Sequence, residues 1–258
     1  MFERRTIEEL TIVDEPSFRD ITLYADLKKV LSRAAYSFRV MPASYGGRSD
    51  RALLLNLTFW AADAGGDVLV TPELDADVVT HVAWHHLASR GLGVAGDKPS
   101  VAALFLGESI ASAFDLYLVG RLLREASDSS FLETQVPAMA DAAAGAGLPE
   151  DDFSKLLESI ARDPASAFAD LRALLFDAVS ALFACDTAED ALAALAAHDR
   201  HRFASLLHHY ELSNWVLYAR AYAGARDDAR TTSVLEALES ADDPLAWLTT
   251  HWIATAAG

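Results

Sequence analysis

The sequence is poor in cysteine and in basic residues, and each shortage removes a class of function. Cys185 is the only cysteine among 258 residues, so an internal disulfide, a cysteine-rich zinc ribbon and an iron–sulfur centre are all excluded. Lys and Arg number 21 against 38 Asp and Glu, giving a formal net charge of -17. Such a surface repels phosphate groups, so we expect binding neither to nucleic acid nor to a membrane.

Long apolar runs are almost absent as well. Residues 101–119 form the single stretch that is long enough to span a bilayer, but it contains Glu108 and Asp115, which are costly in hydrocarbon. We therefore expect a helix buried in protein. The N-terminal residues lack the apolar core of a secretory signal, and a cytoplasmic location is predicted. P-loop and G-x-S-x-G motifs are missing too.

Strand patterns are scarce, and helical periodicity dominates. Short β-like runs occur only at 9–13 and 67–70. The predicted fold class is all-α, mainly helical with at most a few short strands, comprising an antiparallel helix pair that carries a polar site and an additional C-terminal helical layer. The expected helices are 19–40, 51–64 capped by Asp50, 72–90 capped by Thr71, 101–125 capped by Ser100, 151–162, 164–184, 187–198, 199–223, 227–240 and 244–257.

An Ala-, Gly- and Pro-containing stretch at 131–151 is the expected seam of the chain. It separates residues 1–130, an N-terminal helical core with a candidate metal site, from residues 151–258, an Ala-rich helical region. The two regions could also pack as one globular unit.

Two histidines and a glutamate form the most distinctive pattern. His81 and His85 occupy core positions on one face of the helix predicted at 72–90. Glu108 occupies a core position of the next helix. If a short loop makes these helices antiparallel neighbours, a rise of about 1.5 Å per residue places Glu108 opposite the histidine pair.

This arrangement favours a metal site. Two imidazoles and one carboxylate suit zinc, with iron as the alternative, and a divalent cation would offset the cost of burying Glu108. Asp77 or Asp115 could orient a histidine. The simpler interpretation is an ion pair between Glu108 and a protonated histidine.

The segments HVAWHHLASRGLG and FLGESIASAFDLYLVGRLL resemble the active-site helices of the gluzincin zinc metallopeptidases over residues 81–123. The family pattern is H-E-x-x-H with a later zinc-binding Glu, and the resemblance implies His81, His85 and Glu108 as ligands. Val82 stands where the family has its general base, so peptidase chemistry is not implied. His86, Asp115 and Glu133 are possible substitutes for that base.

A second histidine-rich segment places His201, His208, Trp215 and Tyr222 at seven-residue steps. It could supply another ligand, in particular His208. A surface helix with incidental histidines is the simpler interpretation.

The sequence thus predicts a metal-binding helical protein that resembles a metallopeptidase core without its base, a pseudo-peptidase that binds a protein or peptide partner. Three alternatives stay open: an active metal-dependent hydrolase with another base, a non-haem iron oxygenase, and a helical interaction module without metal.

Overall fold

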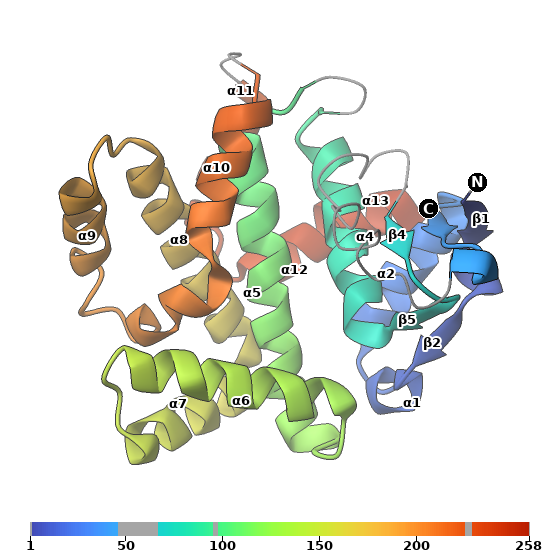
Figure 1. Cartoon of the computed structure of the whole chain (residues 1–258), viewed down its shortest axis with the longest axis horizontal. Coiled ribbons are helices and arrows are strands. Elements are labelled where there is room, and N and C mark those ends of the chain that lie inside the picture. Colours follow the sequence, from blue (N-terminus) through green and yellow to red (C-terminus); the bar gives the residue numbers. More distant parts are fainter. Residues whose placement is uncertain (1, 46–66, 95–97, 225–228, 258) are drawn as a thin grey trace. The chain divides into compact units, whose positions relative to one another are not determined.

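A computed structural model describes residues 2–45, 67–94, 98–224 and 229–257 of the chain (Figure 1). Within these residues helices dominate and the strands are two to four residues long, so the predicted all-α class is confirmed. The helix predicted at 51–64, with Asp50 as its cap, lies outside the described residues.

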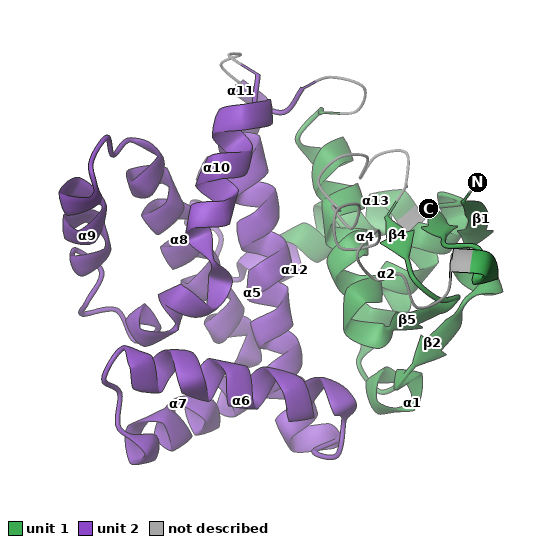
Figure 2. Ribbon diagram, in the orientation of Figure 1, with its two compact units in different colours: residues 1–96, 248–258 green, residues 97–247 purple. Residues whose placement is uncertain are grey.

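The chain forms two compact units (Figure 2). Unit 1 comprises residues 1–96 and 248–258, and unit 2 comprises residues 97–247. These boundaries differ from the seam expected at 131–151 between regions 1–130 and 151–258. Most of that stretch is helix α6 (Ser130–Gly145), because alanine favours helix more strongly than any other residue.

Unit 1 combines helices with two small sheets. In the first sheet β3 pairs antiparallel with β1 and parallel with β4, and in the second β2 pairs parallel with β5. Helix α2 packs against α4, and their facing side chains form the buried core. The elements are β1 (Glu3–Thr6), η1 (Ile7–Glu9), β2 (Thr11–Val13), α1 (Glu15–Phe18), α2 (Thr22–Arg33), β3 (Ser37–Val40), η2 (Ala43–Tyr45), β4 (Val68–Leu69), β5 (Glu73–Asp75), α4 (Ala76–Gly91), η5 (Thr249–Ile253) and α13 (Ala254–Ala257).

The single helix predicted at 19–40 is wrong. Helix α2 ends at Arg33, Ala35 has a positive φ of 46°, and the chain continues as strand β3. In β3 the buried Phe38 and Val40 flank the exposed Arg39, a two-residue alternation that marks a half-buried strand.

The start predicted for the helix at 72–90 is also wrong. Residues 73–75 form β5, which pairs with β2, and Asp75 rather than Thr71 is the N-cap residue of α4. Pairing with a strand distant in sequence overrides the local Thr-Pro signal for a helix start.

The C-terminal segment belongs to unit 1. The π-helical turn η5 and helix α13 contact α2, and η5 also contacts α4. Trp252 of η5 is buried, and a Cβ atom on Gly91 would lie 2.5 Å from its ring. The absence of a side chain at Gly91 therefore lets the indole pack directly on the end of α4.

Unit 2 is built around α5 (Val101–Glu125). Its N-cap Ser100 accepts a hydrogen bond from the Ala103 amide at 3.0 Å, as predicted. Helix α5 is long and apolar enough to span a membrane, yet 78% of its most apolar stretch is buried inside the protein. It packs on α6, on α7 (Glu150–Arg162), on α8 (Pro164–Phe183), on α10 (Leu212–Tyr222) and on α11 (Ala229–Ser240). The remaining elements are α9 (Ala188–Ala196), η4 (Ala204–Tyr210) and α12 (Pro244–Leu248).

The helix predicted at 199–223 is interrupted. Glu211 has left-handed backbone angles (φ 49°, ψ 45°) and separates η4, a 3-10 helix, from α10. The seven-residue stripe through His208 and Trp215 is therefore broken, with His208 exposed and Trp215 buried.

At Gly120, helix α5 closely approaches the backbone of α7. A Cβ at this position would lie 2.7 Å from the backbone oxygen of Ile160, whereas one at Gly145 meets nothing within 4 Å. We expect Gly120→Ala to lower the free energy of unfolding by about 1–2 kcal/mol despite the higher helix propensity of alanine. Gly145→Ala, the matched control, should be neutral or stabilising. Urea unfolding of both variants decides this, and equal effects would contradict the close approach.

Candidate metal centre

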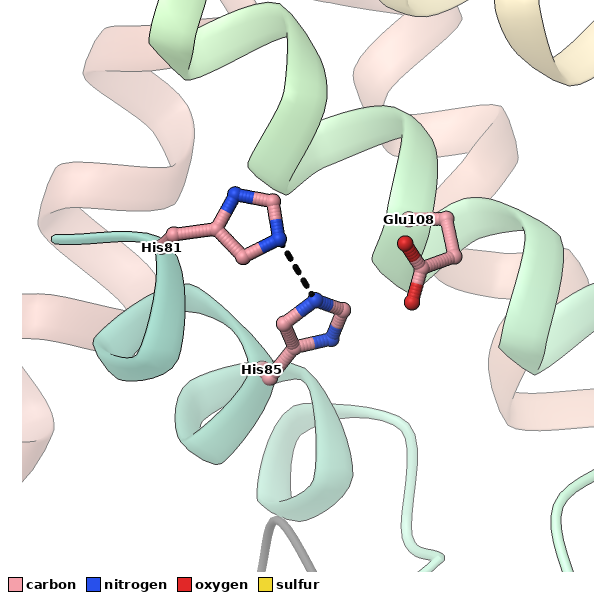
Figure 3. Close-up of side chains that lie close together, drawn as sticks. All are labelled: His81, His85 and Glu108. Atoms are coloured by element: carbon pink, nitrogen blue, oxygen red, sulfur yellow. Dashed lines mark hydrogen bonds between the residues drawn. The ribbon is translucent and has the colours of Figure 1, made fainter. Parts of the chain in front are cut away.

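Helix α4 presents His81 and His85 one turn apart. His81 is half-buried and His85 is buried at 7% exposure. Their Nε2 atoms lie 3.1 Å apart, within hydrogen-bond distance, and Figure 3 shows the two imidazoles turned toward each other. The i, i+4 spacing produces this approach, because such side chains lie on one face of a helix.

The environment of His85 keeps its imidazole neutral. Burial lowers the pKa of His85 well below its ordinary value, and the neighbouring His81 lowers it further. The neutral form of an imidazole is the one that binds a metal ion.

Glu108 is buried at 5% exposure in the middle of α5. Tyr218 of α10 lies within electrostatic range of Glu108. Burial raises the pKa of Tyr218 to about 12, and the charges of Glu108 and Tyr222 add to this increase. An ionised carboxylate at such a depth is costly unless hydrogen bonds or a cation compensate it.

Together, His81, His85 and Glu108 form a group that could hold a metal ion. Each offers one ligand atom, and these atoms lie within 4.8 Å of one another. In Figure 3 the carboxylate oxygens of Glu108 face the two imidazoles. Among the residues that the structure describes, this is the one group of three or more His, Cys, Asp or Glu side chains that meets this condition.

No known protein family, curated protein or solved structure matches this chain. The resemblance to gluzincins therefore rests on the residues at 81–123 alone. That the three residues could hold a metal ion follows from their geometry and does not depend on that resemblance.

The other predicted site residues lie in different surroundings. Asp77 is half-buried in the first turn of α4, and its carbonyl accepts a hydrogen bond from the Thr80 hydroxyl at 2.7 Å. His86 is buried with its ring edge-on to Tyr36, at 5.6 Å between centroids. His208 is exposed on η4.

Asp115 lies two turns after Glu108 on α5, close to two consecutive residues of η4. Burial lowers the pKa of His209, and the Asp115 carboxylate opposes that shift. Burial and Asp115 together raise the pKa of Tyr210. The rings of His209 and Tyr210 are edge-on at 5.0 Å.

The sequence predicted neither Tyr218 as a neighbour of Glu108 nor His209 and Tyr210 as neighbours of Asp115. Their positions depend on the left-handed backbone at Glu211. Non-glycine residues rarely adopt a positive φ, so the local sequence did not predict this turn.

Gly91, Gly93 and Gly96 have the spacing of a dinucleotide-binding loop. However, Gly91 is the last residue of α4, whereas that motif requires the loop to follow a strand and open a helix. The match therefore lacks the strand that precedes this motif.

The depressed pKa of His85 predicts a pH dependence of stability. As the pH falls through about 6.5, the unfolded chain takes up a proton that folded His85 resists, so the free energy of unfolding decreases. His85→Gln should remove this contribution and lose less stability than the parent on acidification, by up to about 1.4 kcal/mol per pH unit below pH 6.

Urea unfolding of metal-free protein at several pH values between 7.5 and 5 measures this difference. Equal losses in the parent and the variant would show that His85 titrates alike in the folded and unfolded chain.

Proposed function

We propose that this protein binds one zinc ion through His81, His85 and Glu108, and that it acts as a binding protein of metallopeptidase-like design rather than as a peptidase. The observation that supports the proposal is that the ligand atoms of two imidazoles and one carboxylate lie within 4.8 Å of one another.

The spacing of the imidazoles suits zinc. Two nitrogens bound to one tetrahedral zinc at about 2.0–2.1 Å lie roughly 3.3 Å apart, and the two Nε2 atoms here are 3.1 Å apart. Imidazole and carboxylate ligands also suit iron, which the experiment must separate from zinc.

Val82 argues against peptidase activity. It follows the first histidine and is buried at 1% exposure, and its side chain can neither accept nor deliver a proton. A metal ion at this site would polarise a bound water or carbonyl, but proton transfer would need another residue. The retained function is then recognition of a protein or peptide partner, in the cytoplasm.

Metal binding is tested first on protein purified without a histidine tag. We expect about one zinc per chain by elemental analysis, and a higher unfolding temperature with zinc than with chelator, because the ion stabilises only the folded form. His81→Ala and Glu108→Gln should each weaken zinc binding at least ~100-fold, since changes outside the ligand set already cost about 10–100-fold. His208→Ala, at an exposed histidine outside the group, is the control.

Other outcomes point to the alternatives. Iron in place of zinc would favour an iron enzyme. Hydrolysis of peptides by the zinc-loaded parent, abolished in Glu108→Gln, would establish an active hydrolase. No uptake of any divalent metal would overturn the proposal and leave a buried ion pair in a helical interaction module.

A further inference from the structure

Helix α9 has an unusual environment for a short helix. None of its nine residues is buried, and Leu192 at its middle is 69% exposed. Thr187 caps it by accepting a hydrogen bond from the Asp190 amide at 3.1 Å. An isolated helix of this length is marginal in water, and most helices gain their stability by burying an apolar face.

The exposed face of α9 is apolar and mostly small. Leu192, Ala193, Ala196 and Ala197 follow one another along it, while Leu195 on the neighbouring side is half-buried. Alanines beside a single large leucine allow a second helix to approach closely, with the leucine placed over small residues.

Charges of opposite sign stand at the two ends of this face. Glu189 lies at its beginning, and Arg200, which follows the exposed Asp199, lies in the turn just beyond its end. Both are exposed, and neither forms an ion pair with a residue that the structure describes. The nearby Arg202 differs, because it pairs with Asp170 at 2.7 Å.

We propose that α9 is a self-association surface that pairs antiparallel with the same helix of a second copy of this chain. A two-fold axis brings each end of one helix to the opposite end of the other, so a face that is acidic at one end and basic at the other is complementary to itself. Pairing Glu189 with Arg200 of the second copy places the axis between Ala194 and Leu195. Leu192 then lies over Ala196 and Ala197 of that copy.

The surface is small. Nine helical residues extend over about 13 Å, and a pair of them covers less than the roughly 1,200–2,000 Å² of a typical stable interface. The dimer is therefore weak, with a dissociation constant between about 1 µM and 1 mM. This association is independent of the metal proposed above.

Sedimentation velocity of the full chain, from about 5 to about 500 µM, tests the proposal. The parent should shift with concentration from 27.8 kDa toward twice that mass. Leu192→Asp should weaken dimerisation at least tenfold, while its helix content and unfolding temperature stay those of the parent. Leu217→Asp is the matched control, since Leu217 on α10 is 63% exposed but lies outside this face.

Charge reversal tests the antiparallel register. Glu189→Arg and Arg200→Glu should each weaken the dimer several-fold, and the double variant should restore it. A parent that stays monomeric over the whole concentration range would overturn the proposal, and a different protein would then be the candidate partner for this face of α9. A dimer that survives Leu192→Asp, or one that Leu217→Asp dissociates equally, would overturn it as well.

Discussion

A carboxylate in the interior of an apolar helix must be compensated, and the candidate site depends on this requirement. Helix α5 contacts several of the other helices of unit 2, and Glu108 is a charged residue among the buried apolar residues in its middle. A buried carboxylate lowers the stability of the fold unless its charge is compensated. His81 and His85 lie within hydrogen-bond distance of each other, and a metal ion held by these two residues and Glu108 would compensate the charge of the carboxylate.

The fold class and the core helices could be predicted because their signals are local. Ser100 caps α5 as expected, and α7 and α8 begin and end within one residue of their predicted limits. The failures occurred where distant residues decide the structure. Strands β3 and β5 are three or four residues long and exist through pairing with β1 and β2, so neither could be recognised from its own sequence.

The histidine pair was predictable for the same reason, since an i, i+4 spacing fixes a common helix face whatever surrounds it. The phenol of Tyr218 was not, because its position beside Glu108 depends on how α10 packs on α5 after the left-handed turn at Glu211. Val82 shows the limit of a motif: the two histidines keep the spacing of the family pattern, but the side chain that the pattern uses for proton transfer is missing.

The return of residues 248–258 to unit 1 has a consequence for the order of synthesis. The ribosome completes α4 early, but Trp252, which packs on Gly91, is synthesised only after all of unit 2. Unit 2, with all its residues between 97 and 247, can fold before that moment, whereas unit 1 must wait. A ribosome that stalls between unit 2 and Trp252 would therefore hold a chain in which this contact with the histidine-bearing helix has not formed.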